Sequence, residues 1–183
     1  MLHGDECVPG VVSSQIHVAE KVWLARIGGF CVRPLCTADQ EACLRFGARV
    51  DREDLRLRFA SPVKLDSPSF REQFLTIDHE RLEALAAIDA ASAILGVVHL
   101  AHTSLSSGDI ALVVRSDLKR RGLGRLLLDR VVRHAARLGL AELTADILYE
   151  NQPMLQLAVR TGFHIVGSSG ASAEMHKTLG QQR

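Results

Sequence analysis

Residues 112–124 of the chain are LVVRSDLKRRGLG, and an amphipathic run continues from them to Leu138. This order predicts a strand at Leu112–Val114, a tight turn, and a long helix that begins beside Gly124. Gly122 and Gly124 let the backbone turn tightly and approach a ligand closely. A helix that begins there presents unpaired N–H groups and the positive end of its dipole. The segment therefore predicts a binding site for a phosphate-containing ligand.

Positive charge is concentrated in the same part of the chain. Eight of the 22 Lys and Arg residues lie between Arg115 and Arg137, against two of the 21 acidic residues, and the formal net charge of the whole chain is only +1. The remainder is therefore net acidic, which argues against a general nucleic-acid binder and favours a compact polyanion. The alternative is a helix start with an ordinary solvated basic face.

Two familiar nucleotide-binding loops do not fit this segment. A dinucleotide-binding loop needs a third glycine where this chain has Leu127. The P-loop pattern G-x-x-x-x-G-K-[ST] occurs nowhere in the sequence. The anion is therefore expected to be held in a different way.

Residues 113–124 resemble the acyl-CoA pyrophosphate loop of the GNAT acetyltransferase superfamily, whose pattern is Q/R-x-x-G-x-G/A, with Lys119 in the place of the first Gln or Arg. The segment NQPM at 151–154, followed by RTGF at 160–163, is similar to the closing Asn…Gly-Phe segment of that superfamily. The resemblance implies an α/β (α+β) GNAT fold, in which a mixed, mostly antiparallel central sheet carries helices on both faces.

Segments further upstream resemble the GNAT domain of bacterial protein lysine acetyltransferases that modify acyl-CoA synthetases. These segments are VRPL at 32–35, LRLRF at 55–59, SPVK at 61–64 and IDHER at 77–81. The resemblance extends from about Phe30 to about Leu179. In that family the domain is often fused to a large synthetase-like region, and nothing of that size is expected here. We expect a single acyltransferase domain at 30–183, preceded by a poorly determined extension at 1–29.

The resemblance implies acetyl-CoA as the cosubstrate and assigns its contacts. Backbone amides of residues 120–125 would hold the pyrophosphate, and the backbone of Leu112 and Val114 would pair with the pantetheine arm. Asn151 would bind the pantetheine, cap its own helix, or both. The expected cofactor-binding residues are Leu112, Val114, Lys119, Arg120, Arg121, Gly122, Leu123, Gly124, Arg125 and Asn151. No metal is expected, because the histidines are scattered and no zinc-ligand spacing occurs.

Asp109 and Val114 are the expected catalytic residues. By the resemblance, Asp109 aligns with the glutamate that serves as general base in the lysine acetyltransferases, and the Val114 N–H would polarise the thioester carbonyl. Asp is one methylene shorter than Glu and would act through an ordered water; a simple strand-end residue is the alternative. The backup bases are Glu80, Asp78 and His79. Related enzymes carry a tyrosine acid where this chain has Ala158, and Tyr149 either lines the acceptor channel or fills the edge of the core.

Periodicity and turn signals predict the remaining elements. Helices are expected at 38–47, 52–59, 67–75, 124–138 and 151–161. Strands are expected at 30–35, 81–88, 93–103, from Asp109 into the opening segment, 140–148, 163–167 and 174–179. The helix after Gly124 should place Leu123, Leu127, Val131, Ala135 and Leu138 on one apolar side.

These observations lead to an acetyl-CoA-dependent N-acetyltransferase that acts on a primary amine, most simply a protein lysine, by direct attack in a ternary complex. Two alternatives stay open. The first is a non-catalytic acyl-CoA sensor, since Asp replaces Glu and the tyrosine is absent. The second is an N-acetyltransferase for a small amine or polyamine.

The expected partners are acetyl-CoA and a protein lysine acceptor, possible examples being acyl-CoA synthetases, with no nucleic acid and no membrane; a monomer or homodimer is expected. The most apolar stretch, Ala84–Val98, is interrupted by Asp89. The N-terminus carries Asp5, Glu6 and Pro9 where a signal peptide would be basic and then apolar. Four cysteines without C-x-x-C spacing are typical of reduced thiols. The sequence therefore predicts a cytoplasmic protein.

Overall fold

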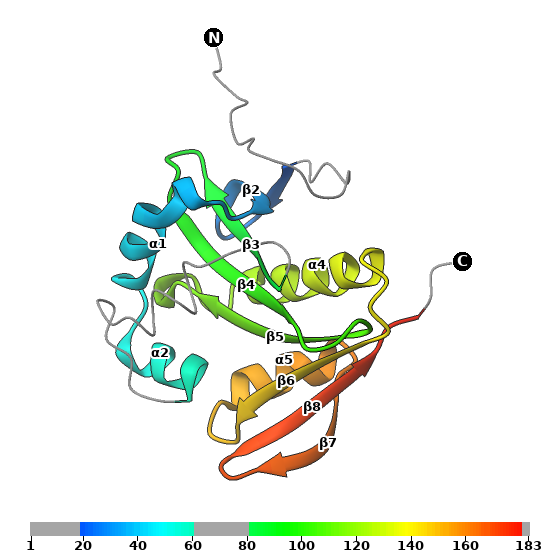
Figure 1. Cartoon of the computed structure of the whole chain (residues 1–183). Helices are drawn as coiled ribbons and strands as arrows, with labels where there is room; N and C mark the ends of the chain where they lie inside the picture. The colour runs from blue at the N-terminus through cyan, green and yellow to red at the C-terminus, as the bar shows by residue number, and fades with distance from the viewer. Residues whose placement is uncertain (1–18, 61–80, 181–183) are drawn as a thin grey trace.

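A computed structural model describes residues 19–60 and 81–180, and within them eight strands form one sheet (Figure 1). The strands are β1 Glu20–Leu24, β2 Gly28–Pro34, β3 Leu82–Asp89, β4 Ile94–His102, β5 Ser107–Val114, β6 Glu142–Leu148, β7 His164–Ser169 and β8 Ser172–Thr178. Their order across the sheet is β1-β2-β3-β4-β5-β6-β8-β7. Every neighbouring pair is antiparallel except β5 and β6, which run parallel. The expected mixed, mostly antiparallel sheet is confirmed.

Helices cover both faces of this sheet (Figure 1). They are α1 Gln40–Gly47, α2 Arg52–Phe59, α4 Leu123–Arg137 and α5 Gln152–Arg160, with short 3-10 helices η1 Thr37–Asp39 and η2 Ser116–Leu118. Helices α4 and α5 pack with Val98, Leu100 and Ile110 on one face, and α1 and α2 pack with Val97 and Val113 on the other. Within the described residues, no helix combines the length and apolar character needed to cross a bilayer.

The amphipathic prediction for α4 is confirmed for four of its five apolar positions. Leu123, Leu127, Val131 and Ala135 are buried and belong to the core beneath the helix. The prediction was wrong for Leu138, which is 39% exposed. Leu138 is the C-cap residue and its N–H still donates to the His134 carbonyl at 3.0 Å, so its side chain lies at the exposed end of the helix, where the chain turns at Gly139 with φ +84°.

One strand was not predicted, and several predicted bounds shift by one or two residues. Residues Glu20–Leu24, within the expected extension at 1–29, form β1 and pair with β2. Strand β5 begins at Ser107 rather than at Asp109, because Ser107 already pairs with Glu142 on β6. The helix predicted at 67–75 lies outside the described residues.

The parallel pair of β5 and β6 is the feature that positions the site. The two strands are paired only at Ser107–Asp109 with Glu142–Thr144. Strand β5 continues to Val114 and β6 to Leu148, but these later residues do not pair with one another. The sheet is therefore open between Ile110–Val114 and Ala145–Leu148.

Candidate active site

The start of α4 presents free backbone donors next to this opening. Gly122 is the N-cap residue at φ +92°, a conformation that residues with a Cβ rarely adopt. The Leu126 N–H donates to the Gly122 carbonyl at 3.1 Å, so the helical hydrogen-bond ladder begins there. The N–H groups of Leu123, Gly124 and Arg125 precede it and have no acceptor within the helix. Three aligned amides at the positive end of a 15-residue helix fit a pyrophosphate.

The side chains around this helix start are mostly engaged with the protein. The Lys119 ammonium forms an ion pair with Asp54 of α2. Arg121 donates to the Arg26 carbonyl at 3.0 Å, and Arg125 lies 3.8 Å from Asp129 on the next turn. Arg120 adopts φ +60° in the turn that leads to Gly122. The backbone amides, more than the side chains, are thus the groups that this loop offers to an anion.

The edge of β5 that faces the opening carries Leu112 and Val114. The Arg115 N–H donates to the Leu95 carbonyl on β4 at 3.0 Å. Hydrogen bonding alternates along an antiparallel pair, so the backbone groups of Val113 also point to β4, and those of Leu112 and Val114 point the other way. The expected pantetheine-pairing residues therefore lie at the edge that β6 leaves unpaired.

Helix α4 begins directly against this edge. A Cβ placed on Gly124 would lie 3.5 Å from Leu112 Cδ2, 3.7 Å from Val114 Cγ2 and 3.4 Å from Leu157 Cδ2 of α5. The structure thus brings the amide cluster of α4, the free edge of β5 and Leu157 of α5 together at one end of the opening. Asn151 caps α5, since its Oδ1 accepts from the Met154 N–H at 3.3 Å. The capping role expected for Asn151 is confirmed.

Asp109 lies at the other end of the opening, where β5 and β6 are still paired. It stands opposite Thr144, whose hydroxyl donates to Asp109 Oδ1 at 3.1 Å. Side chains alternate along β5, so Asp109 faces the same side as Val113, the side covered by α2. The amide cluster of α4 belongs to the opposite side. A ligand held by α4 and an acceptor near Asp109 would therefore meet at the opening from opposite faces of the sheet.

The environment of Asp109 suits proton transfer. Burial raises the pKa of its carboxyl above the ordinary value, and the negative charge of Asp146 on β6 adds to this rise. The Thr144 hydrogen bond and the positive charge of Arg58 on α2 oppose it. A half-buried carboxylate with a raised pKa is a better base for an amine than a fully solvated one.

The remaining predicted residues show no contact with Asp109 or with the start of α4 among the described contacts. Tyr149 directly follows β6 and is 42% exposed. Ala158 is buried in the core between α5 and the sheet, and no acidic group comes from that position. The backup bases Asp78, His79 and Glu80 lie outside the described residues. No group of three or more His, Cys, Asp or Glu in the described part of the chain could hold a metal ion.

Several polar contacts around the site were not anticipated from the sequence. Helix α2 reaches both strands of the opening. Asp54 Oδ2 accepts from Ser116 Oγ just after β5 at 2.5 Å, and Arg56 donates to Glu150 just after β6 at 2.7 Å. No partner could be assigned to the charged residues of α2 from the sequence. The signal available in the sequence was their number in an eight-residue helix, which does not identify partners 62 and 94 residues away.

Comparison with known proteins agrees with this geometry. Residues 30–164 match the family described as the acetyltransferase (GNAT) domain. The GNAT domain of S. lividans PAT superposes with a TM-score of 0.83 at 21% identity, covering 91% of this chain and 100% of that one.

Two further solved structures have the same fold. A GCN5-related N-acetyltransferase from Kribbella flavida gives a TM-score of 0.68 at 21% identity, covering 82% of this chain and 98% of that one. The spermidine N-acetyltransferase from Vibrio cholerae, solved with CoA and spermine, gives 0.65 at 16% identity, covering 82% and 95%. The family match extends over most of the chain, and the superpositions show the same fold. The chain therefore belongs to the GNAT acetyltransferase family.

Proposed function

We propose that this acetyltransferase moves the acetyl group of acetyl-CoA to the side-chain amine of a protein lysine. The observation that carries the proposal is the position of Asp109, half-buried beside the opening of the sheet on the face opposite α4. The segments at 32–35 and 55–59, which resemble bacterial protein lysine acetyltransferases, support a protein acceptor. The close superposition with the GNAT domain of S. lividans PAT supports the same choice.

The first chemical requirement is a neutral amine. A lysine ammonium has a reference pKa of about 10.4, so at neutral pH a base must accept a proton before the nitrogen can attack. Asp109 would accept that proton, through one ordered water. Its raised pKa brings it closer to the operating pH and makes it a stronger base.

The second requirement is a positioned and polarised thioester. The amides at the start of α4 would hold the pyrophosphate, and Leu112 and Val114 would pair with the pantetheine arm as a neighbouring strand would. The Val114 N–H would then donate to the thioester oxygen, on which negative charge develops as the amine attacks. The new C–N bond forms as the C–S bond breaks, and the sulfur leaves with one proton as free CoA.

A small polyamine is the second candidate acceptor. It is favoured by Asp146, whose charge acts on Asp109 and would attract a second cationic group of the same molecule. The structure of the spermidine N-acetyltransferase from Vibrio cholerae has the same fold at 16% identity. An assay with each acceptor can separate the two candidates. A polyamine carries a second cationic amine close to the reacting one, whereas a lysine side chain has a single amine.

The test combines calorimetry with a thiol-release assay. Purified protein is titrated with acetyl-CoA and then supplied with an acyl-CoA synthetase, a lysine peptide or spermidine. We expect binding, followed by CoA release with the protein acceptor. Asp109→Asn should keep acetyl-CoA binding and lower kcat by about 100-fold or more, the usual contribution of a general base.

The other outcomes assign the alternatives. CoA release with spermidine alone would replace the protein acceptor by the polyamine. Binding without release for any acceptor would favour the acyl-CoA sensor and contradict the proposal. Full activity of Asp109→Asn would show that Asp109 is not the base. If the wild-type protein did not bind acetyl-CoA, the assigned cosubstrate site would be wrong.

A further inference from the structure

Arg58 of α2 carries a positive charge that the protein holds in an unusual setting. Its Nε is buried and has no hydrogen-bond partner in the part of the chain that the structure describes. Its guanidinium lies over the Phe59 ring, 4.8 Å from the ring centre. A cation with an unsatisfied buried donor is costly unless a nearby charge or a ligand compensates for it. The cost of burying Arg58 therefore has to be offset by a charge or ligand that lies farther away than the partner in an ordinary ion pair.

The helix brings Arg58 to the acceptor side of the sheet. Leu55, one turn earlier, is buried in the same cluster as Val113 of β5, the residue on whose side Asp109 also lies. The negative charge of Asp109 acts to raise the pKa of Arg58, and the positive charge of Arg58 acts to lower the pKa of Asp109. Burial lowers the pKa of the Arg58 guanidinium to about 10, and the charge of Asp109 opposes this decrease.

Other polar and titratable groups face Asp109 from the neighbouring strands. On β6, Thr144 donates a neutral hydroxyl and Asp146 adds a negative charge. Glu142 on β6 is held by His176 of β8 at 2.9 Å. On β4, the buried His99 is on the same face, opposite Ala111. Arg58 is thus the cation that acts on Asp109 among the residues that the structure describes.

We propose that Arg58 is a positioning residue whose guanidinium keeps the Asp109 carboxylate charged at the acceptor side of the opening between β5 and β6. This proposal rests on the proposed role of Asp109 as the base. Burial alone would favour the protonated carboxyl, which cannot accept a proton from the amine. The positive charge of Arg58 opposes this effect of burial. Strand β5 supplies the base, Asp109, and helix α2 supplies the positive charge of Arg58 that keeps this carboxylate ionised.

The test measures the titration of Asp109 directly, by carbon-detected NMR of its side-chain carboxyl, assigned from the signal that Asp109→Asn removes. In Arg58→Gln the titration midpoint should move upward relative to the wild type, and in Arg58→Lys it should stay nearer to the wild-type value. The acid limb of the kcat/KM profile should move in the same direction. At a pH well below both titration midpoints, kcat/KM of Arg58→Gln should be about tenfold lower for each unit by which the Asp109 pKa rises.

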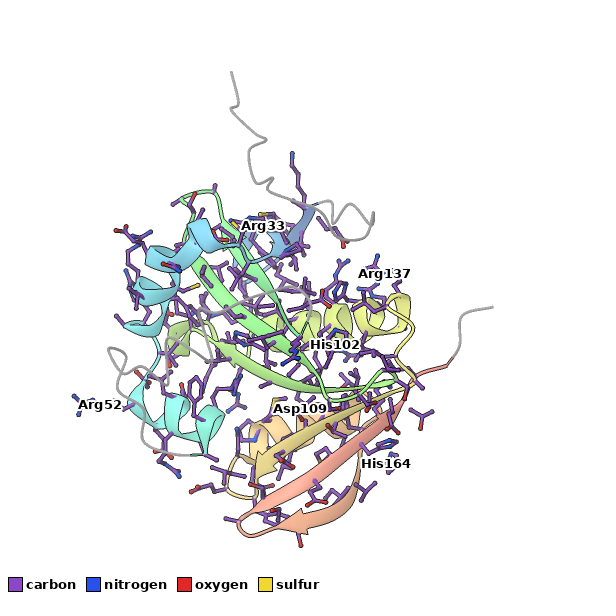
Figure 2. All side chains as sticks on the ribbon, viewed as in Figure 1. Arg33, Arg52, His102, Asp109, Arg137 and His164 are labelled. Atoms are coloured by element: carbon purple, nitrogen blue, oxygen red, sulfur yellow. The ribbon has the colours of Figure 1, made fainter. Side chains whose placement is uncertain are left out.

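Arg52→Gln is the matched control. Arg52 is on the same helix, but it is exposed and its side chain points away from the molecule (Figure 2). It should leave both the Asp109 titration and the activity unchanged. Arg58→Met keeps the packed stem of the side chain without its charge, so it provides a neutral variant if Arg58→Gln does not fold.

Two results would overturn the proposal. One is an Asp109 titration that is the same in the wild type and in both neutral Arg58 variants. The other is an upward shift that Arg52→Gln reproduces, which would indicate a general charge effect. If the wild type acetylates no amine but its Asp109 titration depends on Arg58, the proposed function fails and the link between the two residues is supported.

Discussion

The ammonium group of Lys119 lies against the carboxylate of Asp54, so its charge is directed to helix α2 and not to the amides at the start of α4. We therefore expect Lys119→Met to weaken acetyl-CoA binding by less than about threefold, because the charge of Lys119 is paired with Asp54 and the backbone amides at the start of α4 remain. Calorimetry with acetyl-CoA measures the change. A loss of tenfold or more would mean that Lys119 leaves Asp54 to bind a phosphate.

The two glycines of the loop should respond differently to alanine. Gly122→Ala should lower the free energy of unfolding by about 1 kcal/mol, because φ +92° is strained for any residue with a Cβ. Gly124→Ala should be tolerated, since its Cβ would meet Leu157, Leu112 and Val114 only at ordinary contact distances. Urea unfolding gives both values.

Gly124→Trp is the matching test of the binding site. Its side chain would occupy the space at the start of α4, and we expect it to abolish acetyl-CoA binding. Retention of full binding by this variant would place the pyrophosphate elsewhere.

Asn151 offers a way to separate capping from binding. Asn151→Ala removes the acceptor of the Met154 N–H and should cost about 1 kcal/mol of stability. Asn151→Asp retains that acceptor and should keep the thermal midpoint close to that of the wild type. A loss of acetyl-CoA affinity in the Asp variant would therefore report a contact with the pantetheine, and unchanged affinity in both variants would leave Asn151 with the cap alone.

A buried network of Glu83, His134 and His102 should make stability depend on pH. Glu83 is 8% exposed, and its carboxylate lies 2.6 Å from His134 Nε2 and 3.1 Å from His102 Nε2. Burial acts to raise the pKa of Glu83, but the hydrogen bonds to His134 and His102 outweigh it, and the pKa lies below the ordinary value. The stabilisation is therefore present above the unfolded-state pKa, about 4.3, and is lost as the pH falls through the lower folded-state pKa.

Glu83→Gln tests this network. We expect it to lower the free energy of unfolding at pH 7 by about 1–3 kcal/mol, the usual range for hydrogen bonds to a charged group. The difference from the wild type should narrow as the pH falls below the unfolded-state pKa, about 4.3, towards the lower folded-state pKa of Glu83. Urea titrations at pH 7 and pH 3.5 provide the comparison, and a difference that does not change with pH would rule out this source of stability.

Helices and turns formed by consecutive residues could be predicted, because the sequence patterns that specify them lie within one short segment. The bounds of α2 agree with the prediction at Arg52 and Phe59, and the start of α4 follows from the spacing of Gly122 and Gly124. Strand β1 was missed because it is a short edge strand whose side chains are mostly exposed, so it has no apolar alternation to detect.

The contacts that join distant segments could not be predicted in the same way. Glu83 and His134 are 51 residues apart and belong to no motif. The one available signal was an acid inside the otherwise apolar segment LEALAAI at 82–88, which requires a buried partner but does not identify it. Arg58 lies in the segment LRLRF at 55–59, yet its relationship to Asp109 depends on how α2 packs against β5.

The three residue pairs between β5 and β6 also have a consequence for the lifetime of the protein. Among the described strands, they are the only backbone pairing between two parts of the sheet, here called leaves: the N-terminal leaf, β1–β5, and the C-terminal leaf, β6–β8. A pantetheine arm seated along Leu112 and Val114 would act as a short additional strand that ties the two leaves together. Bound acetyl-CoA would then stabilise the contact between the two leaves. Proteolysis and amide exchange at Ala145–Leu148 would become slower as the acetyl-CoA concentration increases.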